Sequence, residues 1–97
     1  MRRVLVTEDI HPRGLEILMA EANIEIVRVK NIDYETLRIA VRDVDAIIVR
    51  SAIFSADILQ EAKKLKIVSR HGVGCDNIDV DHLSTRGIPV AIASGSN

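Results

Sequence analysis

Aromatic side chains and cysteine are almost absent from the sequence, and its charges nearly balance. Tyr34 and Phe54 are the only aromatic residues, which argues against base-stacking platforms for nucleic acid and against an aromatic ligand cage. Cys75 is the single cysteine, so no disulfide can form within the chain, as expected in a reducing compartment. The net charge of −1 provides no basic excess to bind nucleic acid or an anionic membrane.

Long apolar runs are also missing. No segment approaches the roughly 18 consecutive apolar residues that a membrane span needs. The run Val4–Val6, behind two arginines, is too short for a secretory signal. We therefore expect a cytoplasmic protein. With 97 residues, 47% of them apolar and 28% charged, the chain is expected to form one small globular domain with a modest core.

Short apolar segments alternate with segments of helical spacing along the chain. We expect strands at residues 3–7, 24–29, 46–49, 67–68 and 88–93. Strands separated by helices predict an α/β fold with a parallel sheet and right-handed crossovers. For five strands in about a hundred residues we expect the flavodoxin-like, doubly wound order 2-1-3-4-5. This order places the second strand, whose residues alternate apolar and polar, at an edge.

Capping residues mark the expected helices. Pro12 suits the first turn of a helix after the first strand. Asp33 and Ser55 are the expected N-caps of the next two helices. Asp79 is expected to cap a fourth helix at residues 80–86, in which His82 should be exposed. Gly87 follows at the C′ position, where glycine commonly ends a helix.

Ligands of such sheets bind beyond the carboxyl ends of the strands, near the switch point between strands 1 and 3. This rule selects the loops at residues 8–11, 50–52 and 70–77. Arg50 and Arg70 each follow a strand there and offer a planar guanidinium to a carboxylate or phosphate. Ser51 adds a hydroxyl donor beside Arg50. The residues therefore predict a small-anion site at this edge of the sheet.

Acidic residues of the same loops leave two alternatives open. Either arginine could pair with Glu8, Asp9 or Asp76 instead of a ligand. The pair Glu8-Asp9 also resembles the acidic pair of response-regulator receiver domains, which share this sheet order. Those domains end strand 3 with a phosphoacceptor aspartate, whereas this sequence has Arg50 there. An arginine cannot accept a phosphoryl group and would repel magnesium, so the receiver interpretation is disfavoured.

The turn Gly72–Asn77 begins like a dinucleotide-binding fingerprint. The fingerprint requires a third glycine, where this sequence has Asn77, and Asp76 adds negative charge where a pyrophosphate would lie. Two glycines can instead expose backbone N–H groups as a nest for a small carboxylate, or simply allow positive φ in a structural turn. The histidines (His11, His71 and His82) and Cys75 have no metal-ligand spacing, so no metal site is expected.

Three segments together resemble the D-isomer-specific 2-hydroxyacid dehydrogenases. They are "DAIIVRSA" (Asp45–Ala52), "KLKIVSRHGVGCDNIDV" (Lys64–Val80) and "RGIPVAIASGSN" (Arg86–Asn97). The resemblance covers the whole chain, although small or apolar residues are more usual at the positions of His71 and Cys75. It implies that residues 1–97 form the N-terminal part of a substrate-binding domain, and that an NAD-binding domain and the returning chain come later.

The resemblance also assigns roles to individual residues. Arg50 and Ser51 would line the substrate pocket, with Arg70 beside it. The backbone N–H groups of Val73 and Gly74 would hold the substrate carboxylate, and Asn97 would lie near the interdomain cleft. The family's catalytic arginine, glutamate and histidine and its NAD site have no counterpart here. The resemblance thus implies a homo-oligomeric, NAD-dependent enzyme for 2-hydroxy acids, of which this chain alone is inactive. A stand-alone anion-binding module is the alternative.

Overall fold

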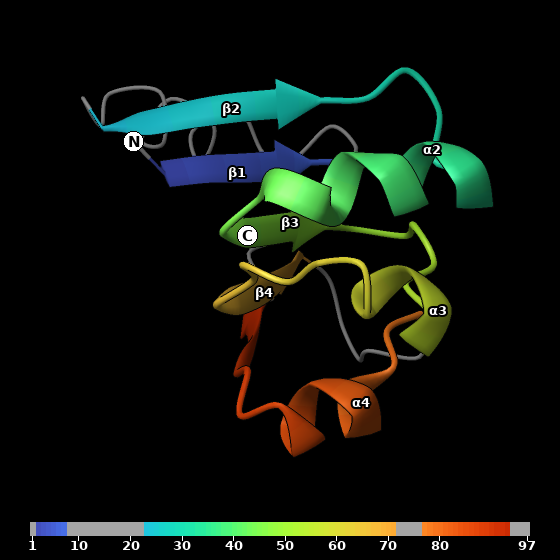
Figure 1. Ribbon diagram of the computed structural model, residues 1–97, viewed down its shortest axis with the longest axis vertical. Helices are drawn as coiled ribbons and strands as arrows, with labels where there is room; N and C mark the ends of the chain where they lie inside the picture. Colours follow the sequence, from blue (N-terminus) through green and yellow to red (C-terminus); the bar gives the residue numbers. More distant parts are fainter. Residues whose placement is uncertain (1, 8–22, 72–76, 94–97) are drawn as a thin grey trace.

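Five parallel strands form one sheet in the order β2-β1-β3-β4-β5. The computed structural model describes residues 2–7, 23–71 and 77–93 (Figure 1). The strands are β1 (Arg2–Val6), β2 (Ile24–Arg28), β3 (Ala46–Val49), β4 (Ile67–His71) and β5 (Val90–Ala93). The predicted flavodoxin-like order is confirmed, and so is the position of the second strand at an edge.

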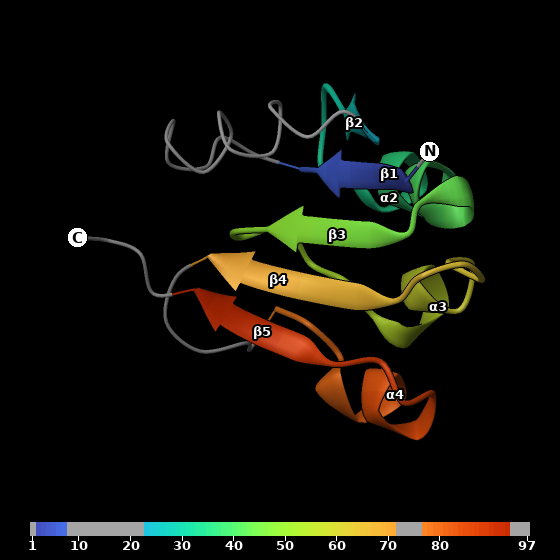
Figure 2. The ribbon, with the colours of Figure 1, turned by 90° about the vertical axis from the view of Figure 1, so that its left-hand side faces the viewer.

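The described helices all lie on one face of this sheet. They are α2 (Tyr34–Ala40), which continues as the 3₁₀ turn η1 (Val41–Asp43), α3 (Ala56–Leu59) and α4 (Val80–Thr85). Figure 1 shows the sheet nearly edge-on with α2, α3 and α4 beside it, and Figure 2 shows the opposite face of the strands. The helix expected after Pro12 lies outside the described residues.

Alternate side chains of each strand enter two different apolar clusters, as the pleat of a strand requires. Leu5, Ile47 and Val68 point to the helical face and are fully buried. There they meet helix residues such as Leu37 and Leu83. On the opposite face Val4, Val6 and Ile48 form a smaller cluster. Residues on both faces of the strands are thus apolar, which is typical of a parallel sheet buried on both sides.

The start of α2 differs from a simple N-cap. Asp33 occupies the N-cap position, but its side chain caps no backbone N–H. The carboxylate instead accepts a hydrogen bond from the Thr36 hydroxyl at 2.5 Å, and this hydrogen bond lowers the pKa of Asp33. Within α2, hydrogen bonds from the Arg38 guanidinium lower the pKa of Glu35. The same contact with Glu35 raises the pKa of Arg38. These pairs are exposed and contribute little to stability.

α4 has caps at both ends. The Asp79 carboxylate accepts a hydrogen bond from the backbone N–H of His82 at 2.9 Å, which confirms the predicted N-cap. At the other end, the N–H of Ile88 donates to the carbonyl of Leu83 and the N–H of Gly87 donates to that of Ser84. These two hydrogen bonds form a Schellman motif, and its two hydrophobic partners, Leu83 and Ile88, are both buried.

Gly87 is the one described residue with positive φ, at 69°. A Cβ atom added there would meet nothing within 4 Å, so its cost would be conformational rather than a clash with neighbours. We expect Gly87→Ala to lower the free energy of unfolding by about 1–2 kcal/mol, because L-residues disfavour this region. Gly87→Asn should cost less, because asparagine tolerates it. Urea unfolding of both variants tests this, and equal losses would contradict it.

α3 and α4 are tied together by an arginine. Arg86, directly after α4, donates from Nη1 to the carbonyl of Leu59 at 2.8 Å and from Nη2 to that of Ala62 at 2.7 Å. Leu59 is the last residue of α3 and Ala62 follows it, and their carbonyls also accept main-chain hydrogen bonds, from the N–H groups of Ala62 and Leu65 respectively. The arginine gives each carbonyl a second donor and fixes the position of α4 against the end of α3.

Two expectations about this region are wrong in detail. His82 was expected to be exposed but is half-buried, because α4 packs against α3 and covers the residue beside Leu83. Its Nε2 atom is buried and has no hydrogen-bond partner among the described residues. The last strand begins at Val90 rather than at residue 88, because Ile88 completes the end of α4.

Candidate functional site

The strand register brings the backbones of two arginines close together at the carboxyl edge of the sheet. Val49, the last residue of β3, pairs with Arg70 of β4, and Arg50 follows Val49 directly. The backbones that carry the two arginines are therefore neighbours at this edge. Arg70 was expected in a loop after a short fourth strand, but it lies within β4, which extends to His71 and pairs with β5 through Arg70 and Ile92.

Asn77 joins the segments that carry these arginines. Its Oδ1 accepts a hydrogen bond from Arg70 Nε at 3.0 Å. Its Nδ2 donates to the carbonyl of Ala52 at 2.7 Å and to that of Arg50 at 3.4 Å. One end of the amide thus contacts the loop after β3, and the other end contacts the Arg70 side chain of β4.

The main chain links the same loops independently of that amide. The N–H of Phe54 donates to the carbonyl of Asn77 at 2.8 Å, and the N–H of Asp79 donates to the carbonyl of Phe54 at 3.0 Å. Phe54 and Ile78 thereby form a parallel β-bridge, and both side chains are buried. This bridge sets the separation of the β3–α3 and β4–α4 connections.

Arg70 is held by neutral groups. Besides its contact with Asn77, its Nη1 donates to the carbonyl of His71 at 2.7 Å. The acidic residues named as alternative partners of the arginines, Glu8, Asp9 and Asp76, lie outside the described residues, so that alternative stays a prediction. Arg50 and Ser51 are exposed beside Arg70 and have interactions of their own. The edge thus combines a fixed guanidinium with an exposed one.

The sequence-predicted residues divide into two groups. Arg50, Ser51 and Arg70 lie at the same edge of the sheet, as expected from the ends of β3 and β4. The nest residues Val73 and Gly74 lie outside the described residues, as do Asn97, Glu8, Asp9, His11, Asp76 and Cys75. Asn77 was noted only as a departure from the glycine fingerprint. The available signal was an amide, which can donate and accept at once, three residues after Gly74.

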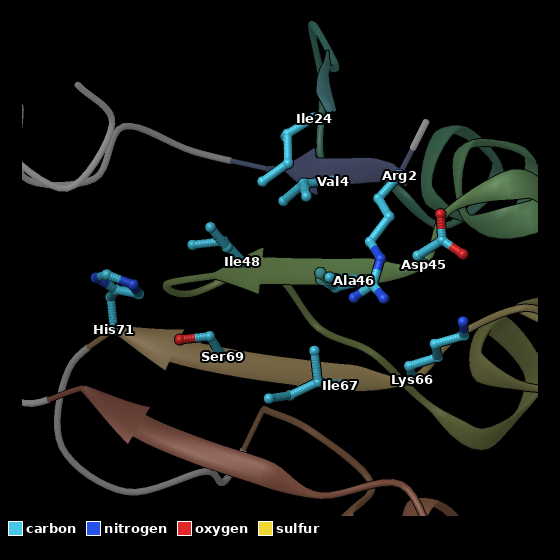
Figure 3. A pocket seen from close by; sticks show the side chains of 11 residues that line it. Arg2, Val4, Ile24, Asp45, Ala46, Ile48, Lys66, Ile67, Ser69 and His71 are labelled. Atoms are coloured by element: carbon cyan, nitrogen blue, oxygen red, sulfur yellow. The ribbon is translucent and has the colours of Figure 1, made fainter. Parts of the chain in front are cut away.

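The opposite face of the sheet has a hollow of about 410 Å³ (Figure 3). Aliphatic side chains of four strands form its floor, namely Val4, Ile24, Ala46, Ile48 and Ile67. Arg2, Asp45 and Lys66 border it at the amino ends of the strands, and Ser69 and His71 lie toward the carboxyl ends. This hollow lies across the sheet face and not at the arginine-bearing edge. Its aliphatic floor suits packing against another apolar surface rather than anion binding.

The described part of the chain has neither a metal site nor a membrane-spanning helix. No group of three or more histidine, cysteine, aspartate or glutamate residues in residues 2–7, 23–71 and 77–93 is placed to hold a metal ion. No helix within those ranges has the length and apolar character needed to cross a membrane. The carboxyl edge is therefore the candidate site that the described residues support.

The chain is similar to known proteins over nearly its whole length. Residues 4–97 match the family described as D-isomer specific 2-hydroxyacid dehydrogenase, catalytic domain. The D-3-phosphoglycerate dehydrogenase of Mycobacterium bovis is 41% identical over 95 residues, which make up 97% of this chain and 18% of that protein. The chain thus spans less than a fifth of the length of such relatives.

Solved structures share the fold. A crystal structure of a protein from Pyrococcus horikoshii superposes with a TM-score of 0.82 at 32% identity and covers 98% of this chain and 28% of that one. The NAD⁺-bound 3-phosphoglycerate dehydrogenase of Entamoeba histolytica superposes with a TM-score of 0.79 at 27% identity, covering 95% of this chain and 33% of that one.

Proposed function

Because the chain belongs to the D-isomer specific 2-hydroxyacid dehydrogenase family, we propose that it is the substrate-binding part of a longer NAD-dependent enzyme. Members of this family are oxidoreductases acting on 2-hydroxy acids. The observation that carries the proposal is the placement of Arg50 beside the strand of Arg70 at the carboxyl edge, with Arg70 held by neutral partners. Two guanidinium groups at one edge suit a small anionic hydroxy acid.

D-3-Phosphoglycerate is the substrate that we propose. The relative of Mycobacterium bovis carries the name D-3-phosphoglycerate dehydrogenase, and so does a human relative that is 33% identical over 98 residues. The enzyme would oxidise 3-phosphoglycerate to 3-phosphohydroxypyruvate, which is the first step of serine biosynthesis. This substrate has two anionic groups, a carboxylate and a phosphate, which is consistent with more than one arginine at the site.

The residues of this chain do not fit the cofactor. Asn77 stands where a dinucleotide fingerprint needs its third glycine, and its side chain is occupied by Arg70 and the loop at Ala52. NAD is therefore proposed to bind to a later domain. Hydride transfer also needs an acid–base group and a cation that polarises the carbonyl. In this proposal the chain binds and orients the substrate, and the later domain supplies the chemistry.

The sheet face without a described helix fits the same division. Ile67 on this face is 40% exposed and lines the aliphatic hollow. Parallel sheets are normally covered on both faces. We propose that a later part of the full-length chain returns to cover this apolar surface and completes the substrate-binding domain.

The 97-residue chain alone is expected to show no dehydrogenase activity. It would be mixed with D-3-phosphoglycerate and NAD, and the appearance of NADH would be followed by absorbance. The expected rate equals that of a mixture without protein, because the proposed chain lacks the cofactor and acid–base residues. The full-length enzyme, assayed in parallel, is the positive control. NADH formation by the 97-residue chain above background would contradict the proposal.

A further inference from the structure

Asn77 occupies a position from which one side chain contacts three parts of the proposed anion site. We propose that Asn77 is a positioning residue, which holds the Arg70 guanidinium and the Arg50 main chain at a fixed separation for the anionic substrate. This inference rests on the proposed function, because it concerns the same site. No catalytic role is assigned to Asn77, since its side chain acts on the substrate only through Arg70 and the loop at Arg50.

The contacts require an amide. Asn77 Nδ2 donates to two carbonyl groups, of Ala52 at 2.7 Å and of Arg50 at 3.4 Å, whereas Oδ1 accepts from Arg70 Nε at 3.0 Å. A flipped amide would place an oxygen against a carbonyl and an NH₂ group against a guanidinium N–H. A carboxylate would keep the bond to Arg70 but lose both donors. Asparagine is therefore the short side chain that satisfies both directions.

The guanidinium of Arg70 is oriented by two hydrogen bonds in different directions. Asn77 accepts from Nε and the carbonyl of His71 accepts from Nη1 at 2.7 Å. These two contacts fix the plane of the guanidinium, and neither of them uses Nη2, which in this proposal donates to a carboxylate or phosphate. A preoriented fork loses less conformational freedom when it binds an anion, so this support contributes to affinity.

The role is separable from folding, because a main-chain link exists beside the side-chain link. The N–H of Phe54 donates to the carbonyl of Asn77, and the N–H of Asp79 donates to the carbonyl of Phe54. Substitution of the Asn77 side chain leaves both hydrogen bonds possible. The β-bridge between Phe54 and Ile78 should therefore persist in variants, and the loops should keep their course while losing the fine placement of Arg70.

The test compares Asn77→Ala and Asn77→Asp in the full-length enzyme, with Asn31→Asp as the matched control. Asn31 is exposed in the β2–α2 connection and undergoes the same change of charge. Asn77→Ala is expected to raise KM for D-3-phosphoglycerate about 10-fold with kcat nearly unchanged, the pattern of lost uniform binding. Asn77→Asp should raise KM further, because it adds a negative charge. Added salt should remove only the part of this increase in KM that exceeds the increase in the alanine variant. Asn31→Asp should match the parent enzyme.

Two results would overturn the inference. One is a parent-like KM for Asn77→Ala together with a lower melting temperature, which would make the residue structural. The other is an increase in KM confined to Asn77→Asp and abolished by salt, which would make the effect a matter of charge alone. Calorimetric binding of D-3-phosphoglycerate gives the same comparison without turnover. A parent that binds but does not oxidise this acid would contradict only the proposed function, whereas a parent that does neither contradicts both.

Discussion

Arg70→Ala and Arg50→Ala in the full-length enzyme are each expected to raise KM for D-3-phosphoglycerate by about 10- to 150-fold. This range corresponds to a hydrogen bond to a charged group, worth about 1.5–3 kcal/mol. Arg70→Lys should fall between parent and alanine variant, because an ammonium keeps the charge but loses the planar fork that contacts Asn77 and His71. Steady-state kinetics over a range of acid concentrations measures these effects.

Arg42→Ala is the matched control for this experiment. Arg42 is exposed, as Arg50 is, but it belongs to η1 and pairs with Glu61 at 3.3 Å on the helical side of the molecule. Removing it changes the net charge in the same way and is expected to leave KM within about 2-fold, because long-range effects of exposed charges are screened. Equal effects of Arg42→Ala and Arg70→Ala would mean that only net charge matters, and the proposed site would be wrong.

Phe54→Ala is expected to have the largest effect on stability. Phe54 is the largest fully buried side chain in the described part of the structure, with 1% of its surface exposed. Its removal should lower the free energy of unfolding by about 3–5 kcal/mol, through lost burial and the cavity that remains. Such a loss is a large part of the stability of a domain of this size. Urea unfolding of the 97-residue chain followed by circular dichroism measures it.

The neighbouring Ile53 provides the comparison. It precedes Phe54 in the same loop but is 68% exposed. Ile53→Ala should change the free energy of unfolding by no more than about 0.5 kcal/mol, as surface substitutions usually do. A similar loss for both variants would show that the loop as a whole, rather than the buried ring, determines stability. Comparing the two variants thus separates the contribution of the packed Phe54 ring from that of the loop backbone.

Much of the fold follows from local patterns in the sequence. The strand at residues 46–49 was predicted with its observed bounds, because four apolar residues stand between the polar Asp45 and Arg50. Asp79 and Gly87 marked the two ends of α4 correctly, since each satisfies backbone groups that a helix leaves unpaired. The sheet order followed from the number and spacing of the strands.

Features that depend on distant partners were missed. β4 extends through Ser69, Arg70 and His71 because its backbone pairs with β3 and β5, although these side chains are polar. The pattern of apolar residues in the sequence does not indicate which polar residues pair through their backbone with neighbouring strands. The contacts of Asn77 were missed for a similar reason, since Ala52 lies 25 residues away in the sequence. The carboxylate nest at Val73 and Gly74 and the role of Asn97 stay predictions.

The strand order also has a consequence for the path of folding. Because every neighbouring pair is parallel, no two strands can be joined by a tight hairpin, and all sheet contacts are non-local. Three of the pairings close loops of about 20 residues, whereas β1 and β3 close one of about 40, which adds about 0.6 kcal/mol of closure entropy. The seam between β1 and β3 is therefore expected to form last. Residues 46–93, which bring Arg50 and Arg70 together, should assemble before it.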